Sequence, residues 1–199
     1  MKVLLLIDIQ NDFLPGGALA VPDGDQVIAV ANDQIVSADH VVATQDWHPP
    51  GHGSFASQHA GVGVGDVFDL NGLPQIGWPD HCVQGTSGAE FADAIDVSRI
   101  NHVSQKGTDS QIDSYSGFFD NGKRQSTDLD AYLKSIGTTE LNILGLATDY
   151  CVKFSVLDAI ELGYKTNVLV AGCRGVNLNA GDVDNAIEEM RLAGATIVL

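Results

Sequence analysis

Short apolar runs alternate along the chain with longer segments of helical periodicity. The apolar runs predict six strands, at residues 2–7, 40–45, 100–105, 141–145, 166–171 and 195–199. Helical patterns between them predict four helices, at residues 24–37, 126–136, 150–162 and 182–192. Gly137, Gly163 and Gly194 follow three of these helices, at positions where a left-handed residue commonly ends a helix. This alternation indicates an α/β fold in which helices cover both faces of a parallel sheet.

One long segment departs from this alternation. Residues 49–88 are rich in glycine, proline and histidine and show neither period clearly. A loop of that length inside a compact domain is usually functional. Neither an internal repeat nor a linker interrupts the pattern, so we expect a single domain over residues 1–199.

The composition limits which binding partners and which cellular compartment we expect. Hydrophobic residues make up 44% and charged residues 18%, which predicts a folded rather than a disordered chain. The formal net charge of -16 disfavours both nucleic acid and anionic membranes as partners. The first apolar run is too short for a signal peptide, and no stretch is long enough to span a membrane. Three cysteines without CxxC spacing favour the reducing cytoplasm.

Four chemically capable side chains stand where predicted strands end. Asp8, Asp46 and Lys106 close the first three strands, and Cys151 follows the fourth and opens the next helix. Each alone could be an ordinary cap or surface charge. Ligands of open parallel sheets bind beyond the carboxyl ends of the strands, so we expect the four to converge on one site.

Cys151 is the candidate nucleophile. A cysteine in the first turn of a helix lies near unpaired N–H groups and the positive end of the helix dipole, which lowers the thiol pKa. The same N–H groups can hold an oxyanion. A buried structural cysteine is the alternative, and we expect it for Cys82 and Cys173, although Cys82 adjoins a candidate metal ligand. Asp8 can accept the thiol proton, and Lys106 can balance the charge.

Two side chains of a candidate metal site lie two residues apart in the chain. Asp46 and His48 point to one side of an extended segment, and His52 and His81 follow them. One carboxylate and two or three imidazoles suit zinc, iron or manganese. An Asp-x-His pair is weak evidence by itself, because such pairs also occur by chance.

Six motifs together resemble a known family. They occur in the order IDIQNDF (7–13), DWHP (46–49), WPDHCV (78–83), KG (106–107), DSYSGF (113–118) and GLATDYCV (145–152). The chain resembles the nicotinamidase (pyrazinamidase) branch of the isochorismatase-like cysteine hydrolases, over nearly its whole length. The first and last motifs mark the superfamily, whereas the second and third are more specific to nicotinamidases.

The resemblance implies a three-layer, Rossmann-like α/β/α fold with a six-stranded parallel sheet. It implies a cis peptide between Leu146 and Ala147, whose N–H would join that of Cys151 in an oxyanion hole. The spacing of His52 and His59 does not match the additional ligand of some relatives, so we expect waters to complete the metal coordination. The remaining site residues that it implies are the catalytic triad Asp8, Lys106 and Cys151, the metal ligands Asp46, His48 and His81, and the pyridine-pocket residues Phe13, Trp78 and Tyr115.

The activity implied by the resemblance is hydrolysis of nicotinamide to nicotinate and ammonia, with a role in NAD salvage. We expect zinc as the metal, with iron or manganese as alternatives, and pyrazinamide as a further substrate. Another amidase of the superfamily, such as one acting on N-carbamoyl compounds, is the alternative, and the metal motif argues against it. An isochorismatase would lack Cys151, and a non-catalytic binding protein would not need the whole set. Assembly into a homo-oligomer stays open.

Overall fold

A six-stranded parallel sheet forms the centre of the molecule. The computed structural model describes all residues from 1 to 199. Strand order across the sheet is β5-β2-β1-β6-β7-β8, and every neighbouring pair is parallel. Its strands are β1 (Lys2–Ile7), β2 (Val41–Asp46), β5 (His102–Lys106), β6 (Glu140–Leu146), β7 (Lys165–Arg174) and β8 (Thr196–Val198). The sequence therefore predicted the sheet correctly, with strand ends displaced by at most three residues.

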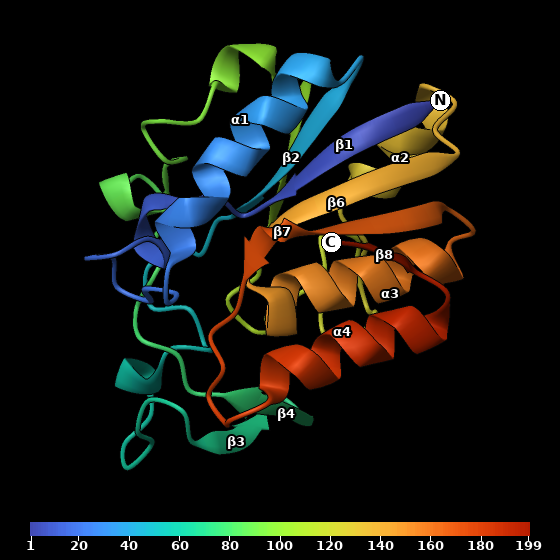
Figure 1. The fold of residues 1–199 in the computed structure, drawn as a ribbon. Helices are drawn as coiled ribbons and strands as arrows, with labels where there is room; N and C mark the ends of the chain where they lie inside the picture. The colour runs from blue at the N-terminus through green and yellow to red at the C-terminus, as the bar shows by residue number, and fades with distance from the viewer.

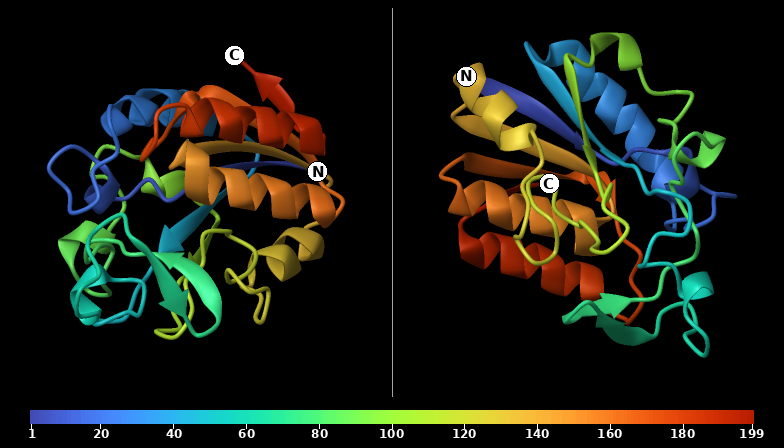
Figure 2. Two further views of the ribbon diagram at one scale, coloured as in Figure 1. Left: turned by 90° about the horizontal axis from the view of Figure 1, so that it is seen from below. Right: turned by 180° about the vertical axis from the view of Figure 1, so that it is seen from behind.

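Four α-helices cover the two faces of the sheet. They are α1 (Val27–Ser37), α2 (Leu129–Ser135), α3 (Lys153–Glu161) and α4 (Asp182–Ala193). Helix α1 lies on one face, α2 and α3 lie on the other, and α4 packs beside α3 (Figures 1 and 2). This placement agrees with right-handed crossovers between parallel strands. The three-layer α/β/α architecture is the one that the sequence predicted.

The ends of these elements follow local chemistry. Residues 3–7 of β1 are all buried, as expected for a central parallel strand covered on both faces. Gly137, Gly163 and Gly194 have φ values of 71°, 91° and 114°, in the left-handed region that glycine adopts without strain. The predicted helix at 24–37 begins with a 3₁₀ turn, and the one at 150–162 begins with a π-helical turn over residues 148–152.

The long segment after β2 has more structure than its composition suggested. It contains an antiparallel hairpin, β3 (Val67–Leu70) and β4 (Leu73–Ile76), and several single 3₁₀ turns. The sequence missed the hairpin because its strands have four residues each and Pro74 interrupts the second. This segment lies beyond the carboxyl ends of the central strands, at the left and bottom of Figure 1.

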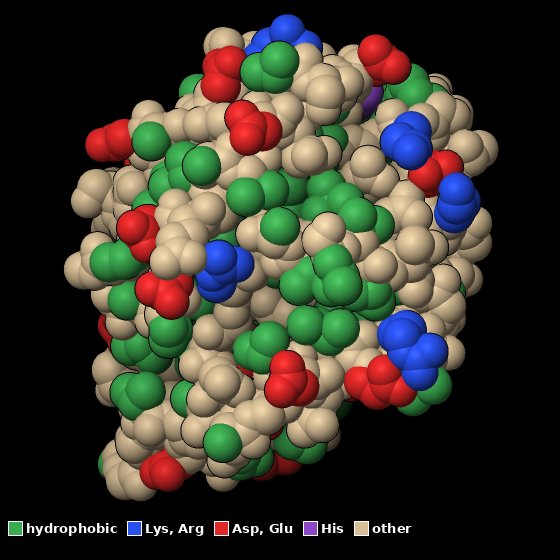
Figure 3. All heavy atoms as spheres, viewed as in Figure 1, with side chains coloured by type: hydrophobic (Ala, Val, Ile, Leu, Met, Phe, Trp, Pro, Cys, Tyr) green, Lys and Arg blue, Asp and Glu red, His purple; other side chains and the backbone are tan.

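The outer surface carries both signs of charge. Acidic and basic side chains are interspersed over the face shown in Figure 3, with apolar side chains between them. No helix has the length and apolar character that crossing a membrane requires.

Candidate active site

Lys106 joins the side chains that were expected to converge. Its Nζ lies 3.0 Å from Asp8 Oδ2, 3.0 Å from Asp46 Oδ1 and 3.5 Å from Cys151 Sγ. A fourth contact, to the carbonyl oxygen of Ser114 at 2.8 Å, completes its surroundings. The strand order places β5, β2, β1 and β6 side by side, so their carboxyl ends bring these residues to one point. The expected convergence is therefore observed.

Asp8 is held in one orientation by its neighbour on β2. Its backbone is left-handed, with φ 47°, immediately after the last residue of β1. The Thr44 hydroxyl donates to Asp8 Oδ1 at 2.6 Å and accepts from the Asp8 N–H at 3.2 Å. Asp8 Oδ2 faces Lys106 as an ion pair but accepts no hydrogen bond of good geometry. A lone pair on this oxygen is consequently free to accept a proton.

Burial and the neighbouring charges oppose each other in this group. Burial alone would lower the pKa of Lys106, but Asp46 and Asp8 outweigh it and raise that pKa well above its ordinary value. Burial raises the pKa of Asp8, with Lys106 opposing the shift. Burial also raises the pKa of Cys151 well above its usual range, again opposed by Lys106. The expectation of a lowered Cys151 pKa is therefore wrong for the resting site, where the thiol keeps its proton.

The other two cysteines are buried in different surroundings. Burial raises the pKa of the Cys82 thiol well above its ordinary value and that of Cys173 to about 12. Only Cys151 of the three lines a cavity together with candidate metal ligands. Cys82 and Cys173 are packed among apolar side chains, as the structural alternative described.

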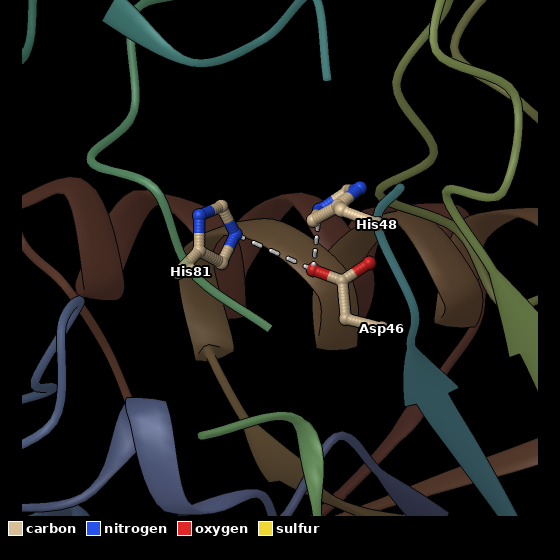
Figure 4. A group of neighbouring side chains, drawn as sticks. All are labelled: Asp46, His48 and His81. Atoms are coloured by element: carbon tan, nitrogen blue, oxygen red, sulfur yellow. Dashed lines mark hydrogen bonds and ion pairs between the residues drawn. The ribbon is translucent and has the colours of Figure 1, made fainter. Parts of the chain in front are cut away.

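Asp46, His48 and His81 form a compact group of metal-type ligands (Figure 4). Asp46 Oδ2 lies 3.1 Å from His48 Nε2 and 3.5 Å from His81 Nε2. Tetrahedral zinc ligands about 2.1 Å from the metal lie roughly 3.4 Å apart, so these spacings fit a shared ion. All three residues are buried, and they come from β2, the residues just after it, and the segment after β4.

Backbone carbonyls fix both imidazoles in the ligand form. His48 Nδ1 is 2.9 Å from Gly107 O, and His81 Nδ1 is 2.7 Å from Pro79 O. A carbonyl can only accept, so each Nδ1 carries a hydrogen, and each Nε2, which faces Asp46, is the nitrogen that would bind a metal. Gly107 is required here, because a Cβ at that position would lie 2.5 Å from the His48 ring. The donor set therefore fits a divalent metal of the zinc type.

His52 uses both of its ring nitrogens in other contacts, and His59 uses one. His52 Nε2 donates to Asp109 O, and its Nδ1 accepts from the Ser54 N–H. His59 Nε2 lies 2.7 Å from the carbonyl oxygen of Gly53. His52 packs against His48, with ring centroids 4.3 Å apart, but has no free lone pair to offer. This geometry favours leaving both residues out of the ligand set.

A small cavity of about 30 Å³ connects the nucleophile with the metal ligands. It has space for roughly two waters, so a pyridine ring requires its walls to move outward. The Leu146–Ala147 peptide is cis, as the resemblance implied. The three predicted pyridine-pocket residues and Ala147, predicted for the oxyanion hole, are among its eleven lining residues, which are Phe13, Leu19, Asp46, Trp78, His81, Asp113, Tyr115, Ala147, Tyr150, Cys151 and Val176.

Several residues that support the site were not identified from the sequence. Gln10 pairs with the backbone of Asp46 through two hydrogen bonds of 2.8 Å, and Asp12 Oδ2 accepts from the Cys82 N–H at 2.7 Å. Asp113 Oδ1 lies 4.0 Å from His48 Nε2. All three belong to the quoted motifs, so position in a motif was the available signal. Gln75, on β4, had no such signal.

Comparisons with known proteins identify the family of this chain. An isochorismatase-domain model matches residues 2–199. The nicotinamidase of Escherichia coli K12 is 54% identical over 98% of this chain and 93% of its own length. The structure of a nicotinamidase/pyrazinamidase from Acinetobacter baumanii matches with a TM-score of 0.96 and 38% identity, over 99% of this chain and 95% of that one. A Pyrococcus horikoshii pyrazinamidase, solved in complex with zinc, matches with a TM-score of 0.80 and 36% identity, covering 99% and 98% of the two chains.

Proposed function

This chain belongs to the isochorismatase-domain family, and we propose that it hydrolyses the carboxamide of nicotinamide to nicotinate and ammonia. One observation carries the proposal: a single cavity is lined by the Cys151 thiol and by the candidate metal ligands Asp46 and His81. The 54% identity to a nicotinamidase supports the same substrate.

The proposed reaction is acyl transfer through Cys151. Asp8 accepts the thiol proton, and the thiolate attacks the amide carbon. Lys106, 3.0 Å from Asp8 Oδ2 and 3.5 Å from the sulfur, stabilises the anionic pair throughout. The N–H groups of Ala147 and Cys151 receive the oxyanion. The proton held by Asp8 passes to the departing nitrogen, which leaves as ammonia. Water then cleaves the thioester, with Asp8 accepting its proton, and releases nicotinate.

Asp46, His48 and His81 would hold a divalent metal, which we propose to be zinc. Zinc in the Pyrococcus horikoshii relative supports this choice, with iron and manganese as alternatives. The metal, when bound, supplies an open coordination position for the nitrogen of the pyridine ring. Phe13, together with the aromatic side chains across the cavity, would then enclose the ring beside the sulfur, a gain from positioning.

Ammonia release from a panel of amides tests the proposal. Nicotinamide and pyrazinamide should be hydrolysed, because both carry a ring nitrogen meta to the carboxamide. N-carbamoyl amino acids should not be, which would exclude the alternative amidase. Turnover of an N-carbamoyl compound without turnover of nicotinamide would refute the proposed substrate. A role in NAD salvage, the cytoplasmic location and a homo-oligomeric state stay predictions.

A further inference from the structure

The wall between two cavities contains a tyrosine whose hydrogen bonds are unusually constrained. Tyr115 and Tyr150 line both the small catalytic cavity and an outer cavity of about 420 Å³. The hairpin β3–β4 borders the outer cavity and contributes Gln75, a residue only 3% exposed. Gln75 and Trp78 both contact the Tyr115 hydroxyl from the protein side.

Both contacts to this hydroxyl have a fixed direction. Trp78 Nε1 lies 3.1 Å from Tyr115 Oη, and an indole nitrogen can only donate. Gln75 Nε2 also lies 3.1 Å from Tyr115 Oη. The same nitrogen is 3.0 Å from Asp113 Oδ2 and 3.0 Å from Ile76 O, which are both acceptors, so its two hydrogens are shared among three acceptors. A flipped amide would place its oxygen against that carboxylate, so the donor orientation of Gln75 is the satisfied one.

The Tyr115 oxygen therefore faces two donors, and its own hydrogen finds no acceptor on the protein. Burial raises the pKa of Tyr115 well above its ordinary value, so the hydroxyl keeps this hydrogen. The hydroxyl hydrogen of this half-buried residue has no protein partner, and an acceptor on a bound ligand would supply one. Tyr115 lines the catalytic cavity, where such a ligand binds.

We propose that Gln75 is a positioning residue that acts through Tyr115. With Trp78, it fills the acceptor positions of the Tyr115 hydroxyl, so that this hydroxyl can only donate to the ligand in the catalytic cavity. The site thereby selects a ligand that presents a hydrogen-bond acceptor to Tyr115. This inference rests on the proposed function, because it assigns a specificity role within the same site.

Binding without turnover separates positioning from chemistry. The metal-loaded Cys151→Ala protein is titrated with nicotinamide by calorimetry, alone and with Gln75→Met, Tyr115→Phe or both. Gln75→Met keeps the side-chain size and removes the donor. Each added change should weaken binding about three- to tenfold, the range of one hydrogen bond. Gln75→Met should have less than about a twofold effect once Tyr115→Phe is present, because the hydroxyl that it orients is gone.

Steady-state kinetics provide the second readout. In the active enzyme, Gln75→Met should raise KM for nicotinamide several-fold and leave kcat within about twofold. Val67→Thr is the matched control, since Val67 lies on the same hairpin, is 71% exposed and should leave both constants unchanged. A general disturbance of the hairpin would instead lower kcat and thermal stability in both variants.

Three results would overturn the inference. Additive losses from Gln75→Met and Tyr115→Phe would show that Gln75 does not act through the hydroxyl. Unchanged binding in Tyr115→Phe would show that the hydroxyl does not contact the ligand, even if Gln75→Met fails to fold. Unchanged binding in Gln75→Met would remove its positioning role. Failure of the unmodified enzyme to release ammonia from nicotinamide would instead refute the proposed function itself.

Discussion

The two ends of the parallel sheet carry charged residues in opposite ways. At the carboxyl end, Asp8, Asp46 and Lys106 are at most 4% exposed and contact one another directly. At the amino end, Glu140 pairs with Lys2 at 2.9 Å and with Lys165 at 3.2 Å, but the two lysine side chains are 57% and 66% exposed. Similar ion pairs therefore stand in two very different environments.

Exposure to water determines how each of the two ion-pair clusters can behave. Exposed pairs exchange contacts with solvent and contribute little free energy. Buried groups cannot do so, and removing one leaves an uncompensated charge. At the carboxyl end, Asp8 Oδ2 accepts no hydrogen bond and is paired with Lys106, which also contacts Cys151, so we propose that Asp8 takes the thiol proton. Burial thus costs stability at one end of the sheet and creates the conditions for catalysis there.

Cys151→Ala should have the largest effect at the carboxyl end. Turnover of nicotinamide should fall by a factor on the order of 10⁴ to 10⁶, because no other thiol reaches the substrate. Circular dichroism and metal content should stay unchanged. Cys82→Ala and Cys173→Ala, as matched controls, should retain substantial activity. An active Cys151→Ala enzyme beside an inactive Cys82→Ala enzyme would show that Cys82, and not Cys151, is the nucleophile.

Asp8→Asn and Lys106→Ala test whether the buried charges act as a unit. Each should lower kcat by a factor on the order of 10² to 10⁴, and the double variant should lose little more than either alone. Lys106→Ala should also lower the free energy of unfolding by about 3 to 5 kcal/mol, because it leaves two buried carboxylates without their cation. Denaturant titration measures this loss. Strictly additive kinetic losses would argue against a shared triad.

Metal removal tests the other half of the carboxyl-end cluster. Chelation, or His48→Ala, should lower nicotinamide turnover by about 10²-fold or more through loss of substrate positioning. Small alkylating reagents should still label Cys151, since the sulfur itself would be unchanged. Benzamide, which lacks the ring nitrogen, should be a very poor substrate of the intact enzyme. Normal turnover by metal-free enzyme, or equal rates for benzamide and nicotinamide, would exclude an anchoring metal.

Glu140→Gln should have the smallest effect, at the amino end. Hydrogen bonds from Lys2 and Asn167, with Lys165 nearby, lower the pKa of Glu140 from its ordinary 4.5 to about 2. A lowered folded-state pKa stabilises the protein above pH 4.5, and this stabilisation is lost as pH falls toward 2. Melting temperatures of the variant and the parent should differ by roughly 1 to 3 °C near pH 7 and converge near pH 2. A large difference in melting temperature at pH 7 would mean that the exposed ion pairs at the amino end stabilise the protein as strongly as buried ones. Activity should not change.

The sequence by itself determined the order of the secondary-structure elements and the location of the site at the carboxyl ends of the strands. Continuous apolar runs are local patterns, so the six parallel strands could be predicted without knowledge of any distant contact. Because the carboxyl ends of parallel strands share one edge, the convergence of Asp8, Asp46, Lys106 and Cys151 followed as well. The quoted motifs also indicated the family, which the isochorismatase-domain match confirms.

Tertiary structure alone decided how these residues interact. The high pKa of Cys151 depends on burial by segments far away in the chain, and local helix position suggested the opposite shift. Carbonyls of Gly107 and Pro79 select the imidazole tautomers, and Gln75 reaches Tyr115 from a hairpin that the sequence did not reveal. Periodicity reports which face of an element is buried. It does not report which atoms of distant segments meet, because that depends on strand register and loop path.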